Sequence, residues 1–291
     1  SKKRLIKFYF MSSKDLLTSV KKLREITGVG FKDCKLAIDE TGGDIDKAIE
    51  FLRKKGIAKA SIKMSRTASE GLCVIEEADG EISLIEINSE TDFVAKNSEF
   101  ISFCKEVSEI NFQNKSDLSK INKSTMKNNL AVETNLIDLI AKIGEKITIR
   151  RANFFDKKNG ENAFYIHGAI EKNIGKIISI VKVSKKETSD IGKKIAMHIS
   201  AMSPMGLEEK DLNEETLNKE KEIIKAELLN SGKQPEIVEK IAKGKLNKFV
   251  SDNTLLNQIW IMDSKKKVSD ILKENDIKIV EFVRYKVGEG V

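Results

Sequence analysis

The hydrophobic positions that follow Met11 form three short helical stripes. In each stripe the apolar residues recur three or four positions apart, the spacing of one helix face. The stripes consist of Leu16, Val20 and Leu23; of Phe31, Cys34 and Ile38; and of Ile45, Ala48, Ile49 and Leu52. Gly28 and Gly42 separate the stripes and Gly56 follows the third, as expected for helix ends. The pattern predicts a three-helix module over 14–56, closed at Gly56, and a basic connector over 57–70 that continues as a helix.

From Gly71 the pattern changes to that of strands. The runs GLCVIEE and EISLIEI flank Asp79-Gly80, which predicts a β-hairpin. A polar break at 88–92 precedes a helix that carries Phe100, Phe103, Cys104 and Val107 on one face. The polar segment 113–125 is expected to be a loop, and a further helix ends near Gly144.

The strand–strand–helix pattern then recurs over residues 163–202. Two β-rich runs, AFYIHGAI and IGKIISIVKV, precede a helix with Ile191, Ile195 and Ile199 on one face. Residues 214–249 read as two antiparallel helices, and a short helix and a last strand, IKIVEFVRY, follow. The predicted fold class is α+β, with two ββα-type subdomains built on antiparallel sheets. We expect them at 71–145 and 146–291, with the helical hairpin inserted at about 214–249.

The composition is that of an ordinary globular protein, with 40% apolar and 33% charged residues among 291. No run approaches the ~18 apolar residues that span a membrane, so we expect no membrane partner. The net charge of +7 permits weak binding to RNA or to an acidic protein face but requires neither. The basic residues 1–10 are interpreted as an extension upstream of a natural start at Met11, although they could also belong to a transit peptide.

Three cysteines, Cys34, Cys73 and Cys104, are far apart and never form a CxxC pair. This spacing disfavours a disulfide framework or a cysteine zinc site. Reduced thiols fit the cytoplasm, with an organellar matrix as the alternative.

The sequence carries no recognised enzyme signature. A GxxxxGK phosphate loop is absent, and Gly28-Val29-Gly30 lacks the preceding strand of a dinucleotide site. The two histidines, His167 and His198, have no cysteine or paired carboxylates near them in the sequence. We therefore expect a protein that works by binding, without enzymatic activity, metal or cofactor.

Several strings, in order over roughly residues 14–290, carry a resemblance to a known family. The most specific are residues 20–60, which begin VKKLREITGVGFKDCK, and INSETDFVAKN at 87–97. The others include KIGEKITIRR, YIHGA, IAMHISAMSP and FVRYKVGEGV. Together they resemble elongation factor Ts, the nucleotide-exchange factor of translation elongation. The resemblance implies a UBA-like form for the three-helix module.

The resemblance also implies a partner and a site. The partner is the GTPase elongation factor Tu, whose GDP is exchanged for GTP. Thr91, Asp92, Phe93 and Val94 match the family's TDFV motif, in which the phenylalanine acts as a wedge that displaces the partner's Mg²⁺ and phosphate loop. Lys21, Arg24, Phe31 and Lys32 match further contacts to the GTPase domain, and His167 matches a contact to the partner's third domain. Lys32 replaces the methionine of many members, so this contact can differ.

Other interpretations of these residues stay open. Phe93 lies seven residues before Phe100, and this spacing would also suit a core residue on the same helical stripe. His198 and Cys34 lie on apolar faces and are interpreted as core residues, whereas Lys21 and Arg24 could be solvated helix charges. The rival function is a basic RNA-binding or ribosome-associated protein, but few aromatics are present for base stacking, and stable nucleic-acid binding is not expected. The charged helical hairpin is a candidate for self-association.

Overall fold

The computed structural model describes residues 13–291 except 28, 64, 186–187 and 233; the interpretation of residues 1–10 and Met11 lies outside these. The chain divides into two compact units. The first comprises Ser1–Glu76, Ser83–Asn153 and Val287–Val291, and the second comprises Glu77–Ile82 and Phe154–Lys286. None of the described helices is both long enough and apolar enough to cross a membrane.

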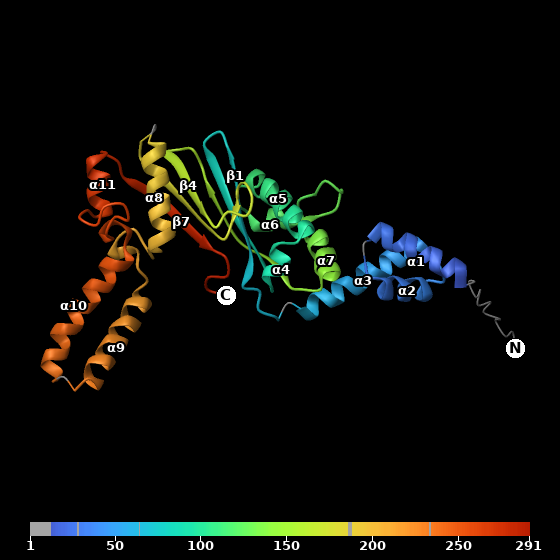
Figure 1. The fold of residues 1–291 in the computed structure, drawn as a ribbon, viewed down its shortest axis with the longest axis horizontal. Coiled ribbons are helices and arrows are strands. Elements are labelled where there is room, and N and C mark those ends of the chain that lie inside the picture. The colour runs from blue at the N-terminus through green and yellow to red at the C-terminus, as the bar shows by residue number, and fades with distance from the viewer. Residues whose placement is uncertain (1–12, 28, 64, 186–187, 233) are drawn as a thin grey trace. The chain divides into compact units, whose positions relative to one another are not determined.

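Three helices begin the first unit: α1 (Ser13–Thr27), α2 (Phe31–Glu40) and α3 (Ile45–Lys63) (Figure 1). The three predicted stripes meet in one core, because each turns its apolar face toward the other two. The buried members of this core are Val20, Leu23, Cys34, Ala37, Ile38, Ala48 and Leu52. The stripes and the core position of Cys34 are therefore confirmed.

The prediction that Gly56 closes the third helix is wrong, because α3 continues without a break to Lys63. Gly56 is buried where α3 packs against α7 (Val132–Ile143). A Cβ at position 56 would lie only 3.2 Å from the Cβ of Ala141. The glycine therefore allows two helices to approach closely, and this role leaves the same sequence signal as a helix end.

The first hairpin consists of β1 (Glu70–Ala78) and β2 (Glu81–Ser89). Asp79 and Gly80 both have positive φ, 52° and 79°, the conformation of a two-residue turn that matches the strand twist. Strand β2 lies between β1 and β3 (Ile147–Phe155). The hairpin is confirmed, whereas β3 was not predicted, although ITIRRANFF is rich in β-branched and aromatic residues.

Four helices lie between β2 and β3: α4 (Asp92–Ala95), α5 (Ser98–Gln113), α6 (Leu118–Lys123) and α7. The predicted stripe of α5, from Phe100 to Val107, is buried. The prediction of a loop throughout 113–125 is wrong, because Asp117 caps a short helix by accepting hydrogen bonds from the backbone nitrogens of Ser119 and Lys120 at 3.1 and 3.2 Å. That helix buries Ile121, its single large apolar contribution to the core.

The second unit contains β4 (Glu161–His167), the two-residue strand β5 (Ile174–Gly175), β6 (Ile177–Val183) and β7 (Ile279–Lys286). Strand β6 pairs antiparallel with both β4 and β7. Helix α8 (Ser189–Met202) packs on β4 and β6. The predicted class, α+β with antiparallel sheets, is therefore confirmed.

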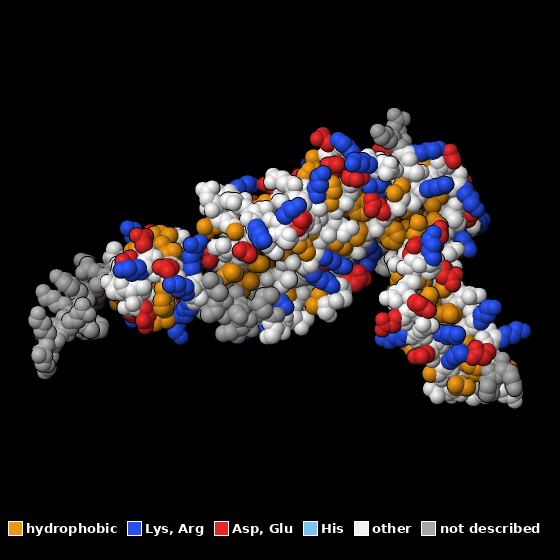
Figure 2. Space-filling model, turned by 180° about the vertical axis from the view of Figure 1, so that it is seen from behind, with side chains coloured by type: hydrophobic (Ala, Val, Ile, Leu, Met, Phe, Trp, Pro, Cys, Tyr) orange, Lys and Arg blue, Asp and Glu red, His pale blue; other side chains and the backbone are white. Residues whose placement is uncertain are grey.

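The predicted helical hairpin is formed by α9 (Glu214–Asn230) and α10 (Pro235–Asn253). Its small core contains Ile224, Leu228, Val238 and Ala242. Lysines, arginines and acidic residues are interspersed over its surface (Figure 2). Short segments complete the unit: the 3-10 turns η1 (Glu209–Asp211) and η2 (Leu255–Asn257) and the predicted helix α11 (Val268–Glu274).

His198 of α8 is a core residue, as predicted. Its ring is buried and stacks on Trp260 at a centroid distance of 5.2 Å. Its Nε2 lies 3.0 Å from Oε1 of Gln258, and its Nδ1 accepts a hydrogen bond from the backbone nitrogen of Ile261 at 3.4 Å. Since Nδ1 accepts, the ring is neutral and carries its proton on Nε2.

Candidate functional site

Phe93 is the most exposed large hydrophobic side chain described, with 80% of its surface accessible. It stands on the single helical turn α4, directly after β2. Phe100, seven residues later, is completely buried. The core interpretation of Phe93 is therefore wrong. The two residues belong to separate helices, because Asn97 caps α5 and accepts hydrogen bonds from the nitrogens of Glu99 and Phe100.

The residues beside Phe93 fix the turn that carries it. The side chains of Val94 and Ala95 are buried, so one side of α4 is held in the core while Phe93 faces outward. Asp92 and Lys96 form an exposed ion pair at 2.7 Å, one helical turn apart. The hydrogen bond that Lys96 donates to Asp92 raises the pKa of Lys96. Such an exposed pair contributes little to stability, so the buried pair and the helix cap hold the turn.

Thr91 is the N-cap of α4, and all of its polar groups are engaged. Its Oγ1 accepts from the backbone nitrogen of Val94 at 3.5 Å, and its carbonyl oxygen accepts from the hydroxyl of Ser89 at 3.0 Å. Its own hydroxyl and backbone nitrogen donate to the two carboxylate oxygens of Glu145, at 2.7 and 3.0 Å. The first turn of α4 is thus tied to the segment that follows α7.

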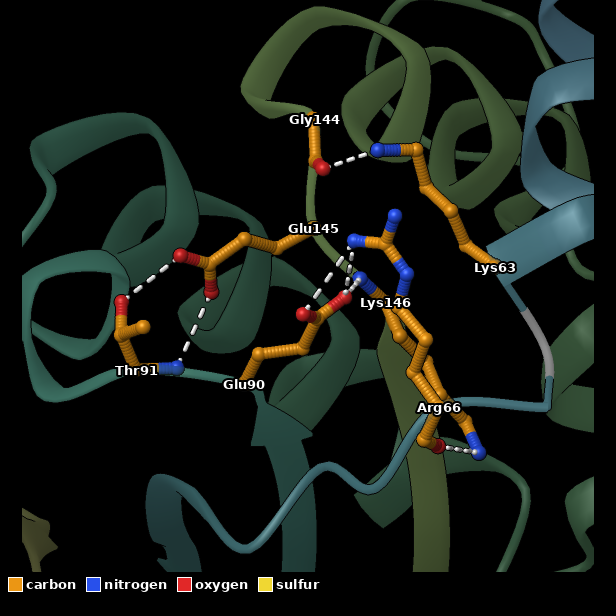
Figure 3. A network of polar contacts seen from close by, with 7 residues as sticks. All are labelled: Lys63, Arg66, Glu90, Thr91, Gly144, Glu145 and Lys146. Carbon is orange, nitrogen blue, oxygen red and sulfur yellow. Dashed lines mark hydrogen bonds and ion pairs between the residues drawn. The ribbon is translucent and has the colours of Figure 1, made fainter.

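A second carboxylate, that of Glu90, joins the same two segments with donor and acceptor exchanged (Figure 3). Glu90 Oε1 accepts a hydrogen bond from the backbone nitrogen of Lys146 at 2.6 Å. Arg66 lies 3.4 Å from Glu90, and Lys146 Nζ donates to the carbonyl oxygen of Arg66 at 2.8 Å. We call Glu90, Thr91, Glu145 and Lys146 the loop clamp. Sequence reasoning missed it, although Glu145 and Lys146 stand directly after the helix-ending Gly144.

The predicted contacts of the three-helix module are on its surface. Lys21 and Arg24 are exposed one turn apart on α1, and Phe31 and Lys32 are exposed in the first turn of α2. Phe31 has 45% of its surface accessible. Leu17, which is 48% accessible, precedes Lys21 by one turn on the same face of α1 and was not predicted. Its spacing from Lys21 and Arg24, i, i+4 and i+7, is the signal that could have identified it.

His167 lies in the second unit, at the exposed end of β4. It pairs with Ile177 across the sheet, and its ring lies 6.4 Å from that of Tyr165. The predicted residues therefore fall on both units: Thr91, Phe93 and the module residues on the first and His167 on the second.

The described residues hold no group of three or more histidine, cysteine or acidic side chains able to bind a metal. The three cysteines are buried and free, and burial raises the pKa of the Cys104 thiol well above its usual range. The surface around α4 offers the exposed ring of Phe93 on a turn whose other side is buried, and such a ring can insert between the side chains of a partner.

Comparison with known proteins identifies the family. The family model described as "Elongation factor TS" matches residues 90–289. The chain belongs to the elongation factor Ts family. It is 42% identical to elongation factor Ts of Dinoroseobacter shibae over 273 residues, which cover 94% of this chain and 92% of that protein. The match to elongation factor Ts of Psychrobacter sp. is 39% over 274 residues (94% and 90%), and to that of Gluconobacter oxydans 35% over 276 (94% and 91%).

Membership of the elongation factor Ts family makes this chain a translation elongation factor. The matched region contains the loop clamp, Phe93 and His167. Lys21, Arg24, Phe31 and Lys32 lie before residue 90, outside the region that the family model matches.

Proposed function

We propose that this protein is the guanine-nucleotide exchange factor of elongation factor Tu. It binds the GTPase with GDP in place, weakens the nucleotide and leaves the site open for GTP. The observation that carries this proposal is Phe93: a phenylalanine of the TDFV motif, 80% exposed on a turn whose other side is buried. An aromatic side chain in water is unfavourable in the free protein, and a partner pocket that buries it would turn this cost into binding energy.

The mechanism needs no covalent chemistry. GDP is held in the partner largely through its Mg²⁺ ion and phosphate-binding loop, and that ion is the largest local charge. An exchange protein that prefers the GTPase with a deformed Mg²⁺ site lowers the affinity of the GTPase for GDP. By thermodynamic linkage, bound GDP lowers the affinity of the GTPase for the exchange protein by the same ratio. Phe93 inserts as the wedge that deforms the site, and Thr91, Asp92 and Val94 hold and orient it.

The remaining predicted residues supply docking contacts in this proposal. Lys21, Arg24, Phe31 and Lys32 contact the GTPase domain, and Leu17 extends their apolar area. His167 contacts the partner's third domain from the second unit. Docking is broad and shallow, so each contact contributes modestly, while Phe93 acts on the nucleotide site itself.

The protein therefore accelerates an exchange without turning over a substrate of its own, and it uses neither a metal nor a cofactor. We place this activity in the cytoplasm, where translation occurs. The hairpin leaves Ile223, Leu229 and Ile237 partly exposed, which supports the further proposal of self-association. Sedimentation with and without Leu229→Ser tests it, and an unchanged monomer in both samples contradicts it.

The test of the exchange proposal is release of a fluorescent GDP analogue from purified elongation factor Tu, chased with excess GTP. We expect the protein at catalytic concentration to speed release and to produce no GDP from GTP when incubated alone. An unrelated GTPase loaded with the same nucleotide is the control. Release at the intrinsic rate at all concentrations contradicts the proposal, and co-purification of RNA in its place would favour the rival function.

A further inference from the structure

Glu145 makes a two-point contact with Thr91 (Figure 3), and Thr91 stands two residues before Phe93 in the chain. One carboxylate oxygen accepts the Thr91 hydroxyl at 2.7 Å and the other accepts the Thr91 backbone N–H at 3.0 Å. A carboxylate that accepts two bonds from one residue fixes both the position and the rotation of that residue, and each bond is charge-assisted. Glu145 therefore determines how the chain enters α4.

The turn α4 needs such external support. It has four residues, Asp92–Ala95, and a single turn is unstable by itself because nucleation fixes several dihedral angles for one hydrogen bond. The exposed Asp92–Lys96 pair adds little. Thr91 provides the cap for Val94, and the Thr91 hydroxyl is oriented for this cap because its proton is donated to Glu145.

Glu145 is itself held in place by its neighbours. Gly144 ends α7 with φ of 89°, a left-handed conformation suited to glycine, and donates its N–H to the carbonyl oxygen of Ile140 at 2.9 Å. The carbonyl oxygen of Gly144 accepts a hydrogen bond from the side chain of Lys63, at the end of α3. On the other side, the Lys146 N–H donates to Glu90. The carboxylate is therefore presented from a fixed backbone.

We propose that Glu145 is a positioning residue for nucleotide exchange: through Thr91 it holds α4 in the orientation that presents Phe93 to the partner. The inference rests on the exchange function proposed above and assigns a role within that function to a residue outside the TDFV motif. Glu145 acts through Thr91 and Phe93 and does not contact the nucleotide. Loss of its two hydrogen bonds leaves α4 free to fray, and Phe93 then spends less time in the productive orientation.

The first experiment compares Glu145→Gln with Glu133→Gln, an exposed carboxylate on α7. Glutamine keeps the size of Glu145 but turns one acceptor into an NH₂ donor that faces a donor of Thr91. We expect Glu145→Gln to lower the exchange rate at saturation about tenfold, with a much smaller change in the half-saturating concentration. Glu145→Asp, which keeps the charge, should recover part of the loss, and Glu133→Gln should match the wild type. A wild-type saturating rate in Glu145→Gln overturns the proposal.

A double-mutant cycle with Phe93→Ala separates positioning from general stability. If Glu145 acts through Phe93, Glu145→Gln should not slow exchange further once Phe93 is replaced by alanine. Its effect on urea unfolding, in contrast, should be the same in both backgrounds. If Glu145→Gln slows exchange by the same ratio in the Phe93→Ala background as in the wild type, Glu145 does not act through Phe93. Thr91→Val, which puts a methyl group in place of the hydroxyl and so removes its bonds with Glu145 and with the Val94 N–H, replaces Glu145→Gln in this cycle if the latter does not fold.

A measurement on the free protein distinguishes failure of this inference from failure of the exchange function. We expect ¹⁵N order parameters at residues 92–95 to fall from about 0.85 toward 0.6 in Glu145→Gln and to stay at the wild-type value in Glu133→Gln. If the wild type does not promote exchange but Glu145→Gln still loses order at residues 92–95, the exchange function is contradicted and the structural part of the inference stands. An active wild type whose turn stays ordered in Glu145→Gln overturns the inference alone.

Discussion

Glu86 Oε1 lies 2.9 Å from the backbone nitrogen of Gly288, a residue 202 positions later in the chain. Glu86 is completely buried in β2, and its carboxylate also accepts hydrogen bonds from Asn88, Arg150 and Arg151 at 3.0, 3.0 and 2.6 Å. Arg150 in turn donates to the carbonyl oxygen of Glu289 at 2.6 Å. One buried carboxylate thus joins β2, β3 and the segment after β7 within the first unit.

Replacing Glu86 by glutamine should destabilise the first unit by about 2–3 kcal/mol, because two arginines lose their anion and the amide NH₂ faces other donors. The arginines are partly exposed, so the loss stays below that of a fully buried pair. Urea unfolding followed by circular dichroism measures it. Glu50→Gln, which breaks an exposed pair with Lys54, is the control and should leave stability almost unchanged. Equal effects of the two substitutions contradict this role of Glu86.

The same carboxylate predicts a loss of stability in acid. Burial by itself raises the pKa of Glu86, but hydrogen bonds from Gly288, Asn88 and Arg151 outweigh it and hold the pKa below the ordinary 4.5. A carboxyl with a lowered folded pKa stabilises the fold fully above its unfolded pKa, and this contribution is lost as the pH falls through the folded pKa. The wild type should therefore lose more stability than Glu86→Gln below about pH 4.5. Parallel pH profiles of the two proteins exclude this account.

His198 should titrate at low pH in the second unit. Burial lowers the pKa of its imidazole below 6.5, and the hydrogen bond that its Nε2 donates to Gln258 opposes this only in part. Because the neutral ring is the folded form, its contribution to stability is present above about pH 6.5 and is lost as the pH falls through the folded pKa. The chain has two histidines, so NMR titration of His167→Gln reports His198 alone. A midpoint at or above 6.5 would contradict the buried neutral ring.

Phe31 should matter for binding and little for folding. It is 45% exposed in the first turn of α2, so we expect Phe31→Ser to weaken binding to elongation factor Tu by about 5–10-fold and to change the free energy of unfolding by less than about 1 kcal/mol. Leu36→Ser is a matched control, since Leu36 is a similarly exposed residue of the same helix on a different face. Calorimetric titration decides it, and equal losses for both variants argue against a specific contact at Phe31.

Much of the fold follows from local patterns in the sequence. The stripes of α1, α2 and α5 and the Asp79-Gly80 turn could be predicted because helix and hairpin signals lie within a few residues of each other. The same rules failed at Gly56, where a close helix contact looks like a helix end. They also failed at Phe93. Its i, i+7 spacing from Phe100 suggests one helical stripe, but between the two residues one helix ends and another begins at the cap of Asn97.

The contacts that hold the candidate site could not be predicted, because they join distant segments. Thr91 and Glu145 are 54 residues apart, and nothing local identifies one as the partner of the other. Glu86 did leave a signal: an acid inside the apolar run EISLIEI implies a buried partner, although not which one. The domain boundaries and the contacts of Lys21, Arg24, Lys32 and His167 stay predictions.

The most direct test of the account is a comparison of Phe93→Ala with Phe100→Ala in two assays. Phe93 is exposed and Phe100 is buried, so the two substitutions should have opposite consequences. Phe93→Ala should slow GDP release from elongation factor Tu at saturation by at least about tenfold and cost less than about 1 kcal/mol in urea unfolding. Phe100→Ala should cost about 3–5 kcal/mol of stability and, where it remains folded, exchange at nearly the normal rate. A Phe93→Ala protein that exchanges at the wild-type rate would contradict the wedge and, with it, the proposed mechanism.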